Sequence, residues 1–113
     1  MSQITTHVLD VSLGQPAGGV PVVLEIEGAQ GEWMELGRGA TDLTGRLSNG
    51  LAPDPLTGGT YRLTFNTGVY FKSLAMDGFY PQVTIVFRIQ DPKQHYHIPL
   101  LLGPFGYTTY RGS

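Results

Sequence analysis

Three histidines carry the side chains of this sequence that are best suited to chemistry near neutral pH. They are His7, His95 and His97. Side chains two positions apart on a β-strand point to the same face, so His95 and His97 could act together. Histidine titrates near neutral pH and can exchange protons with a substrate. With His7 the pair could instead bind zinc through three imidazoles, or the three could be ordinary solvated or hydrogen-bonded histidines.

Other catalytic groups find less support in the sequence. There is no cysteine, which excludes a thiol nucleophile, a thiolate metal site and disulfides. No Gly-x-Ser-x-Gly motif occurs, so an activated serine lacks its usual signature. The aspartates lie in or beside predicted turns, where Asp is usually a turn former. Arg46 and Arg111 could bind a polar ligand, or each could be a solvated surface arginine.

The composition describes a small protein with a lightly charged surface. The 113 residues fit one domain, residues 1–113. Charged residues make up 14%, well under the ~25% of an average domain, which suggests that partner subunits cover part of the surface. The net charge of −2 and the lack of a basic cluster argue against nucleic acid and anionic membranes as partners. With no signal-peptide pattern and no apolar stretch near the ~20 residues of a membrane helix, we expect a cytoplasmic protein.

Glycine and proline divide the chain into short segments typical of strands. The chain has 16 glycines and 8 prolines, and the segments between them are rich in β-branched and aromatic residues. Residues 68–78 have a helix-like spacing of apolar side chains. Strands are predicted over 4–12, 20–27, 32–41, around 46–47, 60–67, 79–90, 95–102 and 105–111. The pattern predicts an all-β fold, a two-sheet sandwich of about eight strands with one short helix.

The predicted strand 95–102 has apolar residues on both faces. One face would hold the even-numbered residues from Tyr96 to Leu102, and the other would hold His95, His97, Pro99 and Leu101. A two-layer sandwich buries only one face of each sheet. The second face therefore needs another cover, and a partner subunit is the simplest one.

Several segments, from both ends of the chain and from its middle, match known signatures. TTHVLD near the start is followed after a turn by VPVVLE, the end reads HYHIPLLLGPFGYTTYRGS, and TDLTGR and TGVYF…FYPQVTIVF lie between them. By these motifs the sequence resembles the 5-hydroxyisourate hydrolases, the enzyme branch of the transthyretin family, over essentially its whole length. Departures at Gly103, Phe105 and Gly106, where Ser, Tyr and Ser are commoner, fall in a predicted turn.

The resemblance implies a site made from several segments. It places His7, Arg46 and His97 as catalytic residues and leaves His95 outside the site. The terminal residues, which could otherwise be a frayed end, would bind the substrate; they are Tyr110, Arg111, Gly112 and Ser113. The resemblance implies no metal and no cofactor. It also implies a homotetramer in which dimers joined at strand edges pack face to face, with the sites in a channel between them.

The activity that the resemblance implies is hydrolysis of 5-hydroxyisourate, the unstable product of urate oxidation. Water would open the six-membered ring at an amide bond, giving 2-oxo-4-hydroxy-4-carboxy-5-ureidoimidazoline on the way to allantoin. One of His7 and His97 would act as general base, and Arg46 would bind ring oxygens and the developing oxyanion. The alternative is a transthyretin-like protein that binds a small planar ligand without catalysis.

Overall fold

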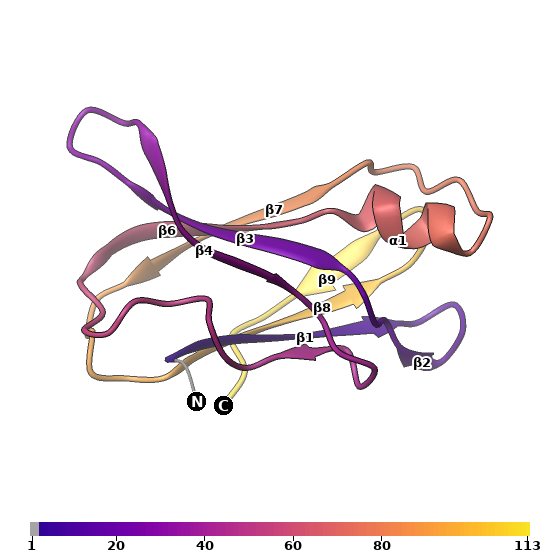
Figure 1. Ribbon diagram of the computed structural model, residues 1–113, viewed down its shortest axis with the longest axis horizontal. Coiled ribbons are helices and arrows are strands. Elements are labelled where there is room, and N and C mark those ends of the chain that lie inside the picture. Colours follow the sequence, from indigo (N-terminus) through magenta and orange to yellow (C-terminus); the bar gives the residue numbers. More distant parts are fainter. Residues whose placement is uncertain (1–2) are drawn as a thin grey trace.

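The computed structural model of the protein describes residues 3–113 as a sandwich of two β-sheets with one short helix (Figure 1). The first sheet has the order β2-β1-β8-β9, and β5 also pairs with β1. The second sheet has the order β4-β3-β6-β7. The strands of the first sheet are β1 (Ile4–Asp10), β2 (Gln15–Pro16), β5 (Arg46–Leu47), β8 (Tyr96–Leu102) and β9 (Tyr107–Thr109). Those of the second are β3 (Pro21–Glu27), β4 (Trp33–Ala40), β6 (Gly59–Phe65) and β7 (Val83–Ile89), and the helix is α1 (Thr67–Ser73).

The core lies between the two sheets and follows the two-residue alternation of strands. In β6 the buried side chains are Tyr61, Leu63 and Phe65, while the residues between them are half-buried. The first sheet contributes alternate residues of β1 and β8 to the same apolar cluster, and α1 adds Tyr70 and Phe71 at one end. The predicted class, an all-β two-sheet sandwich with one short helix, is confirmed.

Several predicted elements are longer than the observed ones, and each shortening has a local cause. The first strand ends at Asp10 because the carboxylate of this residue accepts hydrogen bonds from the amide and hydroxyl of Ser12, which turns the chain. The helix ends at Ser73, just before Ala75 adopts a left-handed conformation with φ of 56°. The predicted strand 79–90 begins only at Val83, after a proline at position 81.

The predicted and observed strands also differ at β2, β8 and β9 of the first sheet. The two-residue strand β2 lies inside a segment predicted as a turn. The predicted strand 95–102 begins at Tyr96, so His95 precedes it. The predicted strand 105–111 narrows to Tyr107–Thr109, but the tail continues beside β8 and Gly112 forms an isolated bridge with His97. The tail thereby returns toward the start of β1 (Figure 1).

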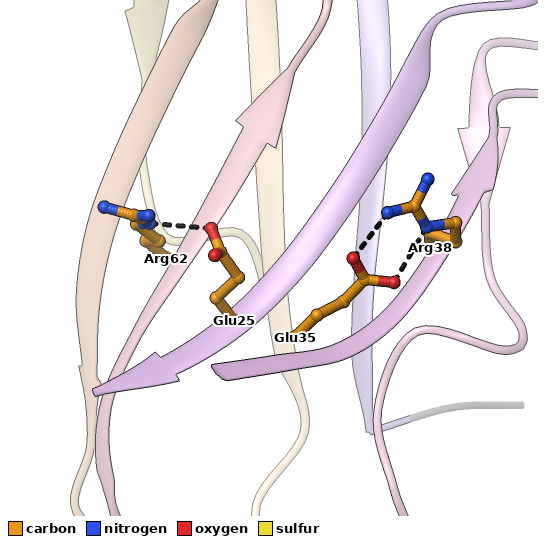
Figure 2. Close-up of polar contacts among 4 residues, drawn as sticks. All are labelled: Glu25, Glu35, Arg38 and Arg62. Atoms are coloured by element: carbon orange, nitrogen blue, oxygen red, sulfur yellow. Dashed lines mark hydrogen bonds and ion pairs between the residues drawn. The ribbon is translucent and has the colours of Figure 1, made fainter. Parts of the chain in front are cut away.

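The outer face of the second sheet carries paired charges. On the second sheet, Arg62 of β6 pairs with Glu25 of β3, and Arg38 pairs with Glu35 along β4 (Figure 2). Arg62 also stacks over the ring of Trp33, with Cζ of Arg62 4.3 Å from the ring centroid.

Within residues 3–113, no helix is both long and apolar enough to cross a membrane.

Candidate functional site

The pairing of three strands brings the histidines and the arginine together. His7 of β1 lies opposite Arg46 of β5, and Thr5 of β1 lies opposite His97 of β8 in a parallel pair. Residues in register on neighbouring strands point to the same face, as do residues two apart on one strand. His7, Arg46 and His97 therefore share the outer face of the first sheet.

The loop that precedes β5 orients His7. Nε2 of His7 lies 2.9 Å from the carbonyl oxygen of Thr44. A carbonyl can only accept a hydrogen bond, so Nε2 of His7 carries the proton and donates it. In the neutral ring, Nδ1 of His7 is then the nitrogen with a free lone pair.

His97 is half-buried and is oriented by a hydrogen bond to its Nδ1. Its Nδ1 lies 2.8 Å from the hydroxyl of Thr5. Burial lowers the pKa of His97, and electrostatic interactions with His95, His7 and Arg46 lower it further, whereas a hydrogen bond with the backbone of Thr5 raises it. His97 is therefore a neutral imidazole near neutral pH, which is the form that accepts a proton.

A tight turn presents Arg46. The carboxylate of Asp42 accepts hydrogen bonds from the amides of Thr44 and Arg46, at 2.8 and 3.0 Å. Gly45 has φ of 79°, and a Cβ there would lie 2.3 Å from the carbonyl oxygen of Val8, so only glycine fits. The guanidinium of Arg46 forms no ion pair with any carboxylate in residues 3–113. Its five N–H donors are therefore available to a ligand.

The tail reaches the same face through Gly112. The amide of Gly112 donates to the carbonyl of His97 at 2.8 Å, and a Cβ on Gly112 would lie 2.7 Å from Cδ2 of His97. The chain can pass so close to the imidazole only because this residue is glycine. Tyr110 and Ser113, on either side, are exposed.

Arg111 is not brought together with His7, Arg46 and His97. Its guanidinium lies 4.5 Å from the centroid of the Tyr96 ring, and its Nη2 donates to the side chain of Gln94 at 2.9 Å. Tyr96 belongs to the core face of β8, so Arg111 points away from the face that carries His97. Contact of Arg111 with a substrate stays a prediction.

Two cavities lie at the open edge of the sandwich rather than at the histidines. The first, of about 220 Å³, lies between β7 and the last two strands, where Phe87, Tyr96 and Tyr110 help to line it. The second adjoins it at Arg88 and Arg111. Neither cavity is lined by His7, Arg46 or His97. On the outer face of the first sheet Arg46 is exposed and the two histidines are half-buried.

The three-histidine zinc site that the sequence allowed is not formed by this chain. Nε2 of His95 and Nδ1 of His97 both approach the hydroxyl of Thr5, at 3.1 and 2.8 Å. Nε2 of His7 is occupied by Thr44. Among residues 3–113, no three side chains of the ligating types are grouped so that they could hold a metal ion.

Sequence reasoning missed Thr5 and Thr44, which orient the two histidines. Thr5 precedes His7 by two residues, and this spacing on a strand was a signal that both share one face. For Thr44 no such signal exists, because its backbone carbonyl makes the contact. The arrangement offers a neutral imidazole, a second imidazole with one free nitrogen and an unpaired guanidinium. Together they could activate water and stabilise an oxyanion.

The chain is similar to known proteins over almost its whole length. The model of the HIUase/Transthyretin family matches residues 4–112. The 5-hydroxyisourate hydrolase of Mus musculus is 46% identical over 113 residues, covering 99% of this chain and 96% of the mouse protein.

Two solved structures share the fold along the whole chain. The 5-hydroxyisourate hydrolase of Klebsiella pneumoniae superposes with a TM-score of 0.87 and 38% identity, covering 100% of both chains. Sea bream transthyretin in complex with thyroxine superposes with a TM-score of 0.91 and 32% identity, covering 98% of this chain and 95% of the other. Sequence and structure together show that this chain belongs to the HIUase/Transthyretin family.

Proposed function

We propose that this chain is an enzyme that hydrolyses 5-hydroxyisourate in the degradation of urate. The observation that carries the proposal is the gathering of His7, Arg46 and His97 on one face of the first sheet, from strands that are remote in sequence. A protein that only binds a planar ligand has no need of a neutral imidazole next to an unpaired guanidinium. Relatives such as the mouse protein are named for this activity, which supports the proposal.

In the proposed mechanism, water attacks an amide carbonyl of the six-membered ring. His97 accepts one proton of the water as general base, because its lowered pKa keeps the imidazole neutral. The new C–O bond forms as the carbonyl oxygen becomes an oxyanion, which Arg46 stabilises. The C–N bond then breaks and the ring nitrogen takes the proton back, so the net change is the addition of one water. The product is 2-oxo-4-hydroxy-4-carboxy-5-ureidoimidazoline.

The other residues of the site bind and orient the substrate. His7 presents Nδ1 as a hydrogen-bond acceptor, since Nε2 donates to Thr44. Tyr110 and Ser113 are the exposed polar groups of the tail and would contact the ring edge. Arg111 would hold the tail in place through Tyr96, so that Gly112 stays against His97. No cofactor enters this chemistry.

We infer that the working enzyme is a homotetramer whose sites lie in a channel between dimers. Within one chain the histidines lie on an open face, and Leu9 and Leu101 on that face are half-buried aliphatic side chains. Strand edges β7 and β9 are unpaired in the sheet order of the single chain and could join subunits edge to edge. A second dimer that covers the face would exclude bulk water from the site, which strengthens the electrostatic contribution of Arg46.

The decisive experiment follows the ultraviolet decay of freshly prepared 5-hydroxyisourate with and without the protein. We expect decay well above the spontaneous rate, in proportion to protein concentration. Unchanged decay together with saturable binding of the substrate would support the ligand-binding alternative. That alternative has one observation in its favour, because the sea bream relative was solved with thyroxine.

A further inference from the structure

The hydroxyl of Thr5 lies between two histidine rings. Its oxygen is 2.8 Å from Nδ1 of His97 and 3.1 Å from Nε2 of His95. Thr5 is 3% exposed, so water has little access to this hydroxyl. The two rings are nearly parallel, with an interplanar angle of 14° and centroids 6.4 Å apart. A chain of hydrogen bonds therefore runs from an exposed histidine, through a buried hydroxyl, to the histidine of the site.

The single proton of the hydroxyl restricts the histidine tautomers. A threonine hydroxyl donates one hydrogen bond and accepts others. If Thr5 donates to His95, it must accept from Nδ1–H of His97, and the lone pair of His97 is then at Nε2. If Thr5 donates to His97 instead, His97 carries its proton on Nε2 and cannot act there as a base. The direction of this one hydroxyl thus decides what His97 presents to a ligand.

Arg46 shares this face with His97. It lies opposite His7, whereas His97 lies opposite Thr5, and a guanidinium has donors only. A His97 lone pair that lies toward this cation would be stabilised, whereas an N–H group there would be destabilised. Within residues 3–113, Nε2 of His97 has no hydrogen-bond partner, which leaves it available to water or substrate.

Two further contacts keep the arrangement in place. Gly112 packs against the His97 ring, because a Cβ there would lie 2.7 Å from Cδ2, so the ring has little room to turn. At the other end of the chain of hydrogen bonds, His95 is exposed, and its Nδ1 can donate to solvent while Nε2 accepts from Thr5.

We propose that Thr5 is a positioning residue that holds His97 in the Nδ1–H tautomer, with His95 as the acceptor behind it, so that the Nε2 lone pair faces the substrate. This extends the proposed function, since it explains how His97 is prepared to act as base. Thr5 does not touch the reacting atoms and acts only through His97. His95 has a supporting part, because solvent could replace it as acceptor.

The test measures the tautomer of His97 directly, by NMR of ¹⁵N-labelled histidine rings at a pH of about 8, where imidazole is neutral. We expect the Nδ1–H form of His97 in the unmodified protein. Thr5→Val, which keeps the β-branched shape, should shift His97 toward the Nε2–H form, and Thr5→Ser should restore it. A His97 ring that is already in the Nε2–H form, or that does not respond to Thr5→Val, would overturn the proposal.

Kinetics and a matched control variant distinguish a positioning role of Thr5 from a general loss of protein stability. Loss of one orienting neutral hydrogen bond should lower kcat about tenfold in Thr5→Val with little change in KM, and Thr5→Ser should recover most of it. The control is Thr6→Val on the same strand, which removes a buried hydroxyl that donates to the carbonyl of Ile98 at 2.6 Å. Thr6→Val should lower the melting temperature and leave the His97 tautomer unchanged. An equal effect of both valines on the tautomer would contradict a specific role for Thr5.

The two proposals fail in different ways. If the unmodified protein does not accelerate 5-hydroxyisourate decay, the proposed function is wrong, but the NMR measurement still decides whether Thr5 sets the tautomer. If the protein is active and the tautomer is the opposite one, the proposed function stands and the role of Thr5 is wrong.

Discussion

The outer faces of the two sheets differ in whether their arginines are paired with carboxylates. On the second sheet both arginines with carboxylate partners, Arg38 and Arg62, are paired with glutamates of the same sheet (Figure 2). On the first sheet Arg46 forms no ion pair within residues 3–113, although the Asp42 carboxylate accepts from its backbone amide, and the groups that act electrostatically on His97 are His95, His7 and Arg46. The guanidinium of Arg46 is thus available to a ligand, whereas those of Arg38 and Arg62 are paired with glutamates of the same sheet.

The difference has a chemical consequence. A carboxylate near His97 would favour the imidazolium and raise its pKa, and it would also occupy Arg46. The observed set does the reverse, since burial and these electrostatic interactions lower the pKa of His97. The face of the first sheet is suited to an anionic or oxygen-rich ligand and to cover by another subunit.

The largest expected effect comes from removing either imidazole of the first face. His97→Ala should lower kcat at least ~100-fold, the low end for loss of a general base. His7→Ala should lower it by about as much, because misplacing a substrate by ~1 Å can cost ~100-fold. His95→Ala should keep most of the activity, because His95 is exposed and contacts the site only through Thr5. The measurement is the decay of 5-hydroxyisourate at several protein concentrations. A loss of activity in His95→Ala as large as that in His97→Ala would show that His95 belongs to the site.

Leu101→Asp should disrupt the proposed subunit contact on the outer face of the first sheet. Leu101 lies in register with Leu9 and is half-buried within one chain. A carboxylate there would be buried without a partner when subunits meet, which is costly. Sedimentation should show dimers or monomers that are still folded, with activity lost. Val23→Asp is the matched control, because Val23 is half-buried on the outer face of the second sheet. A tetramer that survives Leu101→Asp would argue against this face as the interface.

Gly112→Ala should have an intermediate effect. The new methyl group would meet the His97 ring, and a displacement of under 1 Å in a catalytic group can cost tenfold or more, so we expect kcat to fall about tenfold. The control is Gly106→Ala in the preceding loop, where a Cβ would meet nothing within 4 Å. Thermal stability should change little in either variant. Equal activity of the two variants would mean that the tail does not position His97.

The pH profile tests which form of His97 works. Because its pKa is lowered, His97 stays neutral at the ordinary histidine pKa of ~6.5. After correction for spontaneous decay, the rate should hold at that pH and fall only at lower pH, as the ring becomes protonated. A histidine with an ordinary pKa would place this fall at about pH 6–7. A rate that already falls as the pH drops from about 8 to 7 would contradict the lowered pKa.

Much of this arrangement could be predicted from the sequence, but not all. The alternation of side chains predicted that His97 and Leu101 share a face, and family motifs singled out His7 and Arg46. The parallel pairing of β1 with β8, which sets Thr5 opposite His97, could not be predicted, because it depends on contacts between segments about as far apart as the chain allows. The packing of Arg111 on Tyr96 depends equally on tertiary structure.

The smallest effect is expected on the second face. Glu25→Gln and Arg62→Gln, singly or together, should leave 5-hydroxyisourate hydrolysis unchanged, because this pair lies on the other sheet from His97. The side chains of Arg62 and Glu25 are 30% and 19% exposed, so their coupling in a double-mutant cycle of unfolding free energy should be at most about 1 kcal/mol. Such a pair contributes little to the free energy of unfolding and does not determine the fold. If the double variant lost activity as His97→Ala does, charge on both faces would serve the site, and the contrast between the two sheets would not hold.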